Sequence, residues 1–490
     1  MEQEVVGANP TSCTNIMSEK IIKPSVNLPV GFTDRKEKEL VVRDFLIKQI
    51  KKVMTKYGFE YLETPSFEYT ESLGKFLPDK DRPSEGVFSF EDGKKWLSLR
   101  YDLTAPLARF AAKNFDNIPK PFKRYQLGQV WRNEKPGPGR FREFLQFDAD
   151  YVGTNNLLAD SELCVLISEI LEECGLEKNE YSIKISNRKL SKGLLEYLNI
   201  QNESQQTTTL RAIDKLDRVG IDGVKLLLGK GRKDKSGDFT RGAKLKENQI
   251  EKILEFLNSK GLDQLEKTGC KNKLFNEGIS ELKQMVKNFN FFKFKNFQVD
   301  PAVVRGLEYY TGPIFEAELA FKVKNERGVD VEFGSLGGGG RYDNLVKRFK
   351  NQDCPATGVS IGLDRLLYAL NKKSIFNFNS KSPILICVLD EQFMNYYFKI
   401  LNLLRLNNIN SEIYSGSSGF KGQLKYADRR NCKYVIICGE KEVSKELVTL
   451  KNLVLGTKVS SRIKTREDWT QSKDVQKTFA LSNLLKEIKI

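Results

Sequence analysis

The chain has 490 residues, of which 40% are hydrophobic and 29% are charged; this is the size and composition of a globular protein with about three domains. It contains no histidine. Ser-His-Asp and Cys-His nucleophilic sites, a histidine general base and zinc sites with imidazole ligands are therefore excluded. Its eight cysteines include no CxxC pair, which favours reduced thiols in a cytoplasmic protein over a disulfide framework or a cysteine metal site.

The net charge of +16 is unevenly distributed along the chain. Residues 181–300 hold 24 basic and 15 acidic side chains, and residues 381–490 hold 19 basic and 11 acidic ones. Two basic modules attached to a nearly neutral body are typical of a protein that binds a polyanion, most simply a nucleic acid. A lysine-rich solvated surface is the alternative interpretation of the same charges.

The apolar runs of the sequence have the length of strands, and none reaches the length of a membrane-spanning helix. Residues 1–28 have neither an apolar h-region nor an arginine, so they do not resemble a secretory or mitochondrial leader. We expect a flexible N-terminal tail over residues 1–28 and a cytoplasmic protein without membrane contact.

The first 190 residues carry short helix and strand patterns in turn. Asp34 and Glu37 have capping-box spacing, which predicts a helix that ends at Gly58. Further periodicity predicts strands over 59–62 and 97–104, a helix over 106–112, strands over 122–133 and 141–152, a helix over 159–174 and a strand over 181–185.

The strands predicted over 122–133 and 141–152 are joined by a segment rich in proline and glycine, which predicts a hairpin with a long loop. Successive side chains of a strand point to opposite faces. One face of the hairpin would therefore carry polar and aromatic side chains, namely Gln126, Arg132, Glu134, Arg142, Phe144, Gln146, Asp148 and Asp150. The opposite face would be apolar, with Leu145, Phe147, Ala149 and Tyr151.

The second half of the chain changes character twice. Short helical patterns with many lysines predict an inserted helical module from about 190 to 298, and strand patterns return over 298–318 and 329–333. The glycine run 334–340 predicts a tight bend, and a strand over 358–363 precedes a helix from Asp364. After residue 381 strands and helices alternate, which predicts a separate small α/β domain: 384–389, 392–406, 411–414, 421–430 and 434–438.

Four segments carry polar side chains that a fold alone does not require: 99–106, the hairpin, 304–313 and 358–365. Arginines on fixed strands, beside glycines that permit close approach, suit a clamp for nucleotide phosphates. Phe144, on the same face, offers a stacking surface for a base. A buried ion pair would explain any one arginine equally well, but the four segments together favour a nucleotide site.

These residues resemble the histidyl-tRNA synthetase family of class II aminoacyl-tRNA synthetases, from about residue 29 to about 455. Residues 58–65, 132–144 and 358–365 are similar to class II motifs 1, 2 and 3. Residues 305–310 (Arg-Gly-Leu-Glu-Tyr-Tyr) and 339–344 (Gly-Gly-Arg-Tyr-Asp-Asn) are similar to signatures of the histidine branch. Residues 423–430 resemble the anticodon-binding domain of that branch.

The resemblance implies an α/β and α+β multidomain fold. Its parts would be a class II antiparallel-sheet catalytic core over 29–190 and 299–380, a basic helical insertion domain over 191–298 and a C-terminal α/β anticodon-binding domain over 381–490. The implied activity is ligation of L-histidine to tRNA(His) through histidyl-adenylate, with ATP and Mg²⁺. The resemblance also implies a homodimer, with Pro65 of motif 1 at the interface, and no metal held by histidine or cysteine.

For ATP, the resemblance implies that Arg132 holds the α-phosphate, that Arg140 assists at the triphosphate with Glu134 nearby, that Arg365 clamps the far end and that Phe144 stacks on adenine. Arg132 would also be catalytic.

The resemblance further implies a catalytic Arg305, placed at the reacting carboxylate and α-phosphate. The amino-acid site would consist of Asp102, Thr104 and Gln146 at the α-amino group and of Asp150 and Tyr310 at the imidazole, with Tyr309 and Tyr342.

Several features depart from the family pattern. Asp102 and Asp150 stand where many members carry glutamate, and Asn344 replaces a common glycine. The loop 135–139 resembles a bacterial subgroup variant, which leaves open whether an extra 5′ guanosine of the tRNA is read. Residues 456–480 match no pattern.

The alternative interpretations keep the fold and change the role. A catalytically inactive paralogue could act as a regulatory or RNA-binding subunit, like the partner of ATP phosphoribosyltransferase. Such subunits usually lack the C-terminal domain and lose key arginines, whereas Arg132, Arg305 and Arg365 are all present here. A synthetase for another amino acid is a further alternative, although Asp150 with Tyr310 suits a ring N–H donor.

Overall fold

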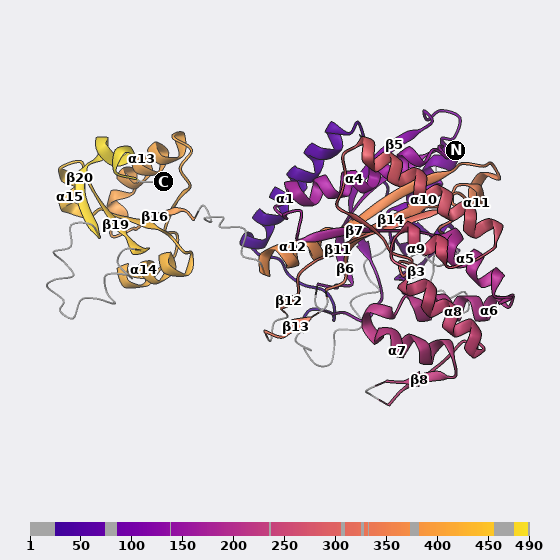
Figure 1. The fold of residues 1–490 in the computed structure, drawn as a ribbon. Coiled ribbons are helices and arrows are strands. Elements are labelled where there is room, and N and C mark those ends of the chain that lie inside the picture. The colour runs from indigo at the N-terminus through magenta and orange to yellow at the C-terminus, as the bar shows by residue number, and fades with distance from the viewer. Residues whose placement is uncertain are drawn as a thin grey trace. The chain divides into compact units, whose positions relative to one another are not determined.

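The computed structural model describes residues 25–73, 86–137, 139–234, 237–304, 309–324, 328–331, 333–372, 382–454 and 475–488. Its contacts divide the chain into two compact units, residues 1–376 and 377–490 (Figure 1). Most of the expected N-terminal tail and most of residues 456–480 lie outside the described residues. Among those described, no helix combines the length and the apolarity needed to cross a membrane.

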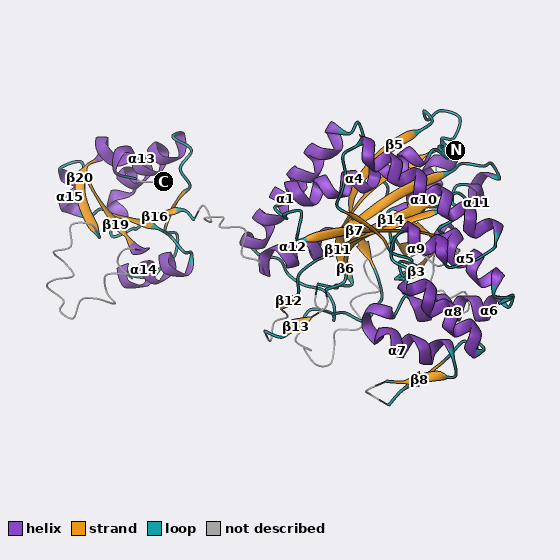
Figure 2. Cartoon of the chain, in the orientation of Figure 1, coloured by secondary structure: helices purple, strands orange, loops and turns teal. Residues whose placement is uncertain are grey.

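An eight-stranded sheet forms the centre of the larger unit, with helices around it (Figure 2). Its order is β1 (Glu60–Tyr61), β5 (Phe122–Trp131), β6 (Glu143–Val152), β15 (Ala356–Gly362), β14 (Ser335–Arg341), β11 (Pro313–Leu319), β7 (Tyr181–Asn187) and β10 (Phe297–Val299). Only the outermost pairs, β1 with β5 and β10 with β7, are parallel. The antiparallel-sheet core is therefore confirmed.

The predicted hairpin is also confirmed, because β5 and β6 pair from Phe122 opposite Val152 to Trp131 opposite Glu143. The apolar side of β6 lies in the main hydrophobic core with Leu145, Phe147, Ala149 and Tyr151. Helices α1 (Glu37–Lys56), α4 (Leu157–Glu173) and α12 (Leu363–Lys372) lie together along one side of the sheet and contribute to that core (Figure 1). The polar side of β6 faces the other way.

Smaller elements complete the larger unit. A three-stranded sheet of β2 (Phe67–Tyr69), β4 (Lys95–Leu99) and β3 (Ser89–Asp92) lies beside α2 (Thr70–Leu73) and α3 (Thr104–Lys113). The others are the pair β12 (Val323–Lys324) and β13 (Asp330–Val331) and the short helix α11 (Lys347–Lys350).

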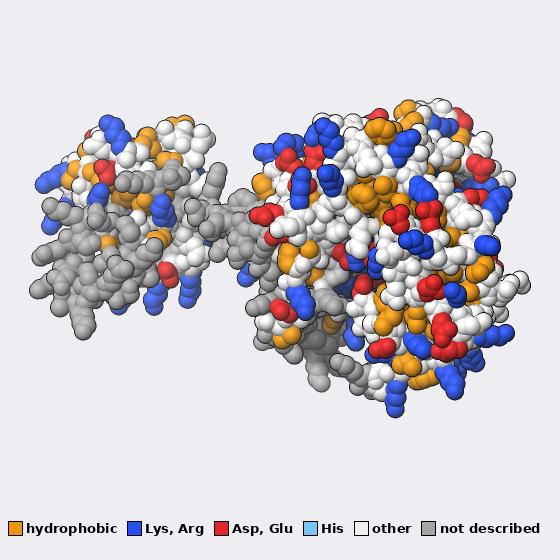
Figure 3. Space-filling view, viewed as in Figure 1, with side chains coloured by type: hydrophobic (Ala, Val, Ile, Leu, Met, Phe, Trp, Pro, Cys, Tyr) orange, Lys and Arg blue, Asp and Glu red, His pale blue; other side chains and the backbone are white. Residues whose placement is uncertain are grey.

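The helical module predicted from about 190 to 298 consists of α5 (Arg188–Tyr197), α6 (Glu203–Ile213), α7 (Leu216–Leu228), α8 (Glu247–Asn258), α9 (Leu262–Lys267) and α10 (Lys273–Phe291), with a hairpin of β8 (Gly231–Lys233) and β9 (Phe239–Arg241). Its buried side chains are continuous with the core of the sheet. Lys and Arg side chains, with some acidic ones among them, line the edge near α7 and β8 (Figure 3).

The smaller unit is built on a five-stranded sheet of order β17 (Ser411–Ile413), β16 (Ile384–Ile386), β18 (Tyr434–Ile437), β19 (Leu447–Asn452) and β20 (Gln476–Ala480). Its helices are α13 (Met394–Leu406), α14 (Phe420–Arg429), α15 (Glu440–Ser444) and α18 (Leu484–Glu487). The predicted alternation of strands and helices is confirmed through β18. The antiparallel strands β19 and β20 were not among the predicted elements.

Two predictions at helix starts are wrong. Helix α1 begins at Glu37 with Lys36 at its N-cap and without a capping side chain, so Asp34 forms no capping box. The strand predicted over 97–104 ends at Leu99, because the Asp102 carboxylate accepts the backbone N–H of Ala105 at 3.0 Å and the chain turns into α3. This local hydrogen bond competes with an extended backbone.

The tight bend predicted over 334–340 is wrong as well, because these glycines form most of the central strand β14. A Cβ atom at Gly337 would lie 2.6 Å from the backbone oxygen of Ser360, and one at Gly340 would lie 2.6 Å from that of Pro313. Glycine is required here because the backbones of neighbouring strands approach each other closely, and not because the chain turns.

Candidate active site

The polar face of β5 and β6 gathers most of the expected site residues. The strand register places Val130 opposite Phe144, Gly128 opposite Gln146 and Arg124 opposite Asp150. Phe144 lies toward the loop end of the hairpin, and Asp150 lies six residues further along β6. Residues expected to hold a nucleotide and residues expected to hold an amino acid thus follow one another along a single strand.

Arg132 directly follows β5 and contacts two aromatic rings. Its guanidinium carbon is 4.5 Å from the ring centroid of Tyr101 and 5.1 Å from that of Phe144. Its Nε donates to the backbone oxygen of Tyr101 at 3.2 Å, and its Nη2 donates to Oε1 of Gln146 at 3.3 Å. These contacts hold the guanidinium in one orientation, as recognition of a phosphate requires.

Glu134 and Arg140 lie at the loop end of the same hairpin. The Glu134 carboxylate accepts the hydroxyl of Tyr101 at 2.9 Å and pairs with Arg140 at 3.8 Å. The Arg140 side chain is 51% exposed, so its guanidinium can move toward an anionic ligand at little cost in desolvation.

Arg365 belongs to the first turn of α12, which is tied to the sheet. Its Nη2 donates to the backbone oxygen of Phe333, and its guanidinium carbon is 4.9 Å from the ring centroid of Phe333. The neighbouring Asp364 accepts the backbone N–H of Leu145 at 2.7 Å and pairs with Arg35 at 3.0 Å. These bonds fix the start of α12 against β6.

Further along β6, four side chains form one hydrogen-bonded network. The Gln146 amide nitrogen donates to Asp148 Oδ1 at 2.9 Å and to the Ser360 hydroxyl at 3.3 Å. The Thr104 hydroxyl donates to Asp148 Oδ2 at 3.3 Å. Asp148 is fully buried, and it connects two residues expected at the substrate α-amino group.

Asp150 lies at the far end of the polar face, enclosed on three sides. Arg124 pairs with its Oδ2 at 2.9 Å, and the Tyr342 hydroxyl donates to its Oδ1. A Cβ atom at Gly358 on β15 would lie 2.6 Å from its Cγ. Arg124 and Asp150 are 0% and 2% exposed, so the carboxylate is oriented by an ion pair that solvent hardly reaches.

Burial raises the pKa values of the three aspartates of this site, Asp102, Asp148 and Asp150. Burial first, and the nearby Asp150 carboxylate second, raise the pKa of Asp148 to about 7, although Arg124 opposes the shift. For Asp150, the attraction of Arg124 is the largest opposing influence on a pKa that burial raises. A carboxyl that titrates near neutrality is typical of a functional site.

Three tyrosines stand close to these carboxylates. The rings of Tyr309 and Tyr310 are 4.3 Å apart between centroids, with 3.2 Å between their hydroxyls, and the Tyr342 ring is 6.4 Å from that of Tyr309. Burial raises the pKa values of Tyr309 and Tyr342 well above the ordinary value, so both hydroxyls remain hydrogen-bond donors at neutral pH. Arg305 lies outside the described residues.

Several residues in the contacts of the polar face were not predicted as site residues, among them Tyr101, Arg124, Asp148 and Ser360. Strand alternation had already placed Asp148 on the polar face. Arg124 lies two residues before Gln126 on the same strand, so alternation places it on that face as well. The contacts of Tyr101 and Ser360 depend on how α3 and β15 pack against the hairpin, which no sequence pattern reports.

Among the described residues, no group of three or more Asp, Glu or Cys side chains could hold a metal ion. A magnesium ion keeps most of its ligands as water and substrate phosphate oxygens and often needs only one or two protein carboxylates. The residues present are therefore compatible with a magnesium ion carried by the triphosphate of ATP, and Glu134 is a carboxylate at the loop end of the hairpin, beside Arg140.

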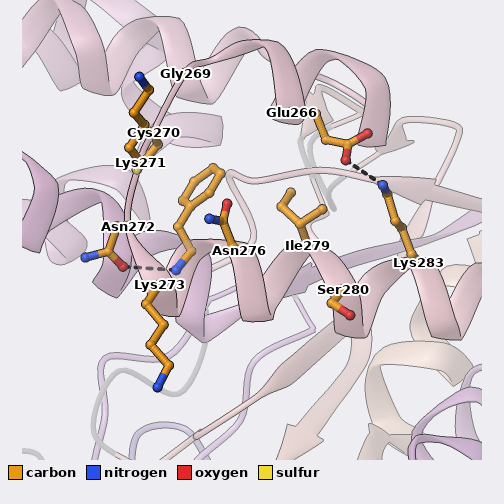
Figure 4. Close-up of a pocket in the computed structure, with 11 residues that line it drawn as sticks. Glu266, Gly269, Cys270, Lys271, Asn272, Lys273, Asn276, Ile279, Ser280 and Lys283 are labelled. Atoms are coloured by element: carbon orange, nitrogen blue, oxygen red, sulfur yellow. Dashed lines mark hydrogen bonds and ion pairs between the residues drawn. The ribbon is translucent and has the colours of Figure 1, made fainter.

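A cavity of about 630 Å³ lies elsewhere in the larger unit, between α9 and the start of α10. Lys283 on its wall pairs with Glu266, and Asn272 accepts the backbone N–H of Phe275 at 3.1 Å (Figure 4). None of the expected site residues lines it. The cavity is therefore separate from the face that carries the expected chemistry.

Comparison with known proteins identifies the family. Residues 31–366 match the model for histidyl-tRNA synthetase, and residues 378–489 match that for an anticodon binding domain. Proteins named histidine–tRNA ligase from Bartonella quintana and Brucella ovis are 46% and 47% identical to the chain, over 96% of it and over 98% and 97% of their own lengths.

Solved structures agree on the fold. The histidyl-tRNA synthetase from Nostoc sp. PCC 7120 has a TM-score of 0.68 and 28% identity, covering 95% of this chain and 99% of its own. A Bacillus halodurans protein described as an ATP phosphoribosyltransferase regulatory subunit/histidyl-tRNA synthetase has a TM-score of 0.63 at 20% identity and covers 82% of this chain and 97% of its own. The latter shows a shared fold only. From the family models and the curated relatives, this chain belongs to the histidyl-tRNA synthetase family.

Proposed function

We infer that the chain is a histidine–tRNA ligase that first joins L-histidine to AMP from ATP and then transfers the histidyl group to the 3′ end of tRNA(His). The observation that carries this proposal is the single polar face of β6, with Phe144 and Arg132 near one end and Asp150 at the other. Six residues of extended strand span about 20 Å. This length accommodates a nucleotide beside an amino acid, with their reacting groups between them.

The proposed binding of ATP is based on the arginines of the site. Arg132, held by two rings, is suited to the α-phosphate, where negative charge develops during the transfer. We propose that adenine stacks on Phe144, that Arg140 contacts the triphosphate and that Arg365 contacts its far end. Magnesium, when bound with ATP, would supply additional positive charge at the phosphates, with Glu134 as its protein ligand.

The proposed binding of histidine is based on the carboxylates and tyrosines of the site. The substrate ammonium group would be received by Asp102, Thr104 and Gln146, and its imidazole by Asp150 with Tyr310, beside Tyr309 and Tyr342. An oriented carboxylate is a suitable acceptor for a ring N–H, and the Arg124 ion pair fixes the orientation of the Asp150 carboxylate.

The activation step requires no general base, because the substrate carboxylate that attacks the α-phosphate is already ionised at neutral pH. The protein then contributes position and positive charge. We propose Arg132 and Arg305 as the two catalytic residues, with Arg305 placed at the reacting carboxylate and α-phosphate. The absence of histidine from the chain is thus compatible with the reaction.

We further propose that residues 29–190 and 299–380 form the catalytic domain, that 191–298 form a basic insertion domain and that 381–490 bind the anticodon of tRNA(His). The enzyme would act in the cytoplasm as a homodimer. The two basic segments of the sequence support tRNA as the partner.

A regulatory subunit without ligase activity is the second candidate, because the Bacillus halodurans protein shares the fold. The presence of Arg132 and Arg365, each held by contacts with its surroundings, and the full-length curated relatives favour the ligase.

Amino-acid-dependent exchange between ATP and pyrophosphate, measured with each of the twenty amino acids, tests the proposal. We expect exchange with histidine alone. Exchange with a different amino acid, or with none, would overturn the assignment.

A further inference from the structure

Asp148 stands at the centre of the amino-acid half of the site and has no part in the reaction as proposed above. Its carboxylate is fully buried. Oδ1 accepts from the Gln146 amide at 2.9 Å, and Oδ2 accepts from the Thr104 hydroxyl at 3.3 Å. Burial of an ionised carboxylate costs free energy unless an ion pair and hydrogen bonds compensate for it. Asp148 has hydrogen bonds, but no ion pair of its own is found in the described structure.

The direction of these hydrogen bonds determines what the two neighbours can offer a ligand. A hydroxyl whose hydrogen points to Asp148 presents its lone pairs elsewhere. Gln146 donates through its nitrogen to Asp148 and to Ser360, so its amide oxygen points the other way, toward Arg132. Asp148 thus makes acceptors of both Thr104 and Gln146, and an ammonium group needs acceptors only.

We propose that Asp148 is a positioning residue for the substrate: it orients the Thr104 hydroxyl and the Gln146 amide as acceptors for the α-ammonium group of histidine and contributes the negative charge that balances that ammonium. This inference rests on the proposed function and deepens it.

The charges around Asp148 support the role. Arg124 is paired with Asp150, and Arg132 is directed at the phosphate end of the face. The other charged or titratable groups that face Asp148 are Arg100, Tyr309 and Tyr342. Arg100 donates to the backbone oxygens of Gln129 and Thr64 and also faces Glu63 and Glu68, and it forms no ion pair with Asp148 in the described structure. With Arg124 paired to Asp150, a substrate ammonium would supply a cation for Asp148.

Protonation of Asp148 would reverse the arrangement. A protonated carboxyl must donate its hydrogen, and of the groups bonded to Asp148 only the hydroxyls of Thr104 and Ser360 can accept it. The local negative charge would be lost, and Asp148 would no longer accept hydrogen bonds at the protonated oxygen, so the orientation of Thr104 and Gln146 would no longer be fixed. Because burial and Asp150 raise the pKa of Asp148 to about 7, binding of the ammonium should weaken as the pH falls below 7 and strengthen as it rises above 7.

The test compares D148N and S360A with the unmodified enzyme in histidine-dependent ATP–pyrophosphate exchange. D148N keeps the shape and removes the charge. We expect it to raise the KM for histidine about 10- to 100-fold, as loss of a charged hydrogen-bond partner does, with kcat and the KM for ATP little changed. S360A removes a hydroxyl that bonds Gln146 and lowers the pKa of Asp148, but it removes no charge. We therefore expect a smaller increase in KM, with the pH dependence retained and displaced to higher pH.

The pH profile gives the readout that a purely structural role would not produce. Titration of the substrate imidazole affects both enzymes equally and cancels in the ratio of their KM values. Only the unmodified enzyme gains a charge at residue 148 as the pH rises, so the KM of D148N divided by that of the unmodified enzyme should increase between pH 6 and pH 8. A KM within threefold of the unmodified value, or a ratio that is constant with pH, would overturn the proposal.

A measurement on the unmodified enzyme keeps the proposal testable if D148N does not fold. Imidazolepropionate has the ring and carboxylate of histidine without the ammonium group. Its inhibition constant, divided by the KM of histidine, should rise with pH over the same range, and a constant quotient would contradict the role of Asp148. Failure of the unmodified enzyme to exchange with histidine would instead overturn the proposed function itself.

Discussion

Gly358 offers a sharp test of whether the position of the Asp150 carboxylate matters for histidine recognition. In Gly358→Ala, the new Cβ would lie 2.6 Å from Cγ of Asp150 and closer still to Oδ1. Ordinary van der Waals contact at Cγ alone requires a separation of about 0.8 Å, and the shorter contact at Oδ1 requires more. Asp150 cannot easily move, because Arg124 and Tyr342 hold it and the space around it is filled.

The expected cost of the substitution has two parts. Overpacking of a filled interior destabilises a protein by about 1–3 kcal/mol, and a displacement of about 1 Å at a substrate-positioning group can lower the rate about 100-fold. We therefore expect Gly358→Ala to lower the thermal unfolding midpoint by several degrees and to lower kcat/KM for histidine about 100-fold in ATP–pyrophosphate exchange.

The matched control is Gly362→Ala, which lies on the same face of the same strand. The nearest atoms to a Cβ atom there belong to the Arg365 side chain, at 3.6 Å, an ordinary contact. We expect its unfolding midpoint to equal or exceed that of the unmodified enzyme, and its kcat/KM for histidine at saturating ATP to change little. If the two variants behave alike, the reasoning from the Asp150 contact is refuted.

Three further predictions follow from the site and the two units. Arg124→Met should leave Asp150 buried without its partner and destabilise the protein by about 3–5 kcal/mol, which calorimetry of the larger unit's transition would detect; an unchanged transition would show that the ion pair is dispensable. Arg305→Ala should abolish histidine-dependent exchange with an unchanged circular dichroism spectrum, and near-normal exchange would refute the role assigned to it. Replacing Lys425 and Arg429, which are exposed on α14, with alanine should weaken tRNA charging and leave exchange intact, and the opposite pattern would reverse the assignment of the domains.

Strand periodicity predicted the part of the site that lies on one hairpin. Proline and glycine in the loop fixed where β5 and β6 end, and alternation then placed Phe144, Gln146 and Asp150 on one face. Both signals are local, so they do not depend on the rest of the chain.

The remaining contacts of the site depend on residues distant in the sequence. Arg124 belongs to a strand segment that looks half exposed, yet it is completely buried because Asp150 lies opposite it. Asp364 meets Arg35 across more than 300 residues of sequence. Charged residues of this kind are buried only when a partner is supplied, and the sequence does not name the partner.

The glycine run illustrates how a local rule can mislead. Gly337 and Gly340 suit a turn by composition, and isolated glycine weakens a strand. In the sheet, β14 lies between β11 and β15, and the backbones of those strands leave no room for a Cβ atom. Packing across three strands therefore outweighs the propensity of the residues.

The fixed side chains of the site explain how a chain without histidine can carry out the proposed chemistry. The proposed activation step needs no general base. The side chains of the site are instead held in one protonation state or one orientation by their surroundings. Arg132 is held by contacts with two rings, Asp150 is fixed by Arg124, and burial keeps Tyr342 protonated. The site therefore depends on prearranged charge, so substitutions that preserve charge but shift position by an ångström, as at Gly358, should be as damaging as those that remove a charge.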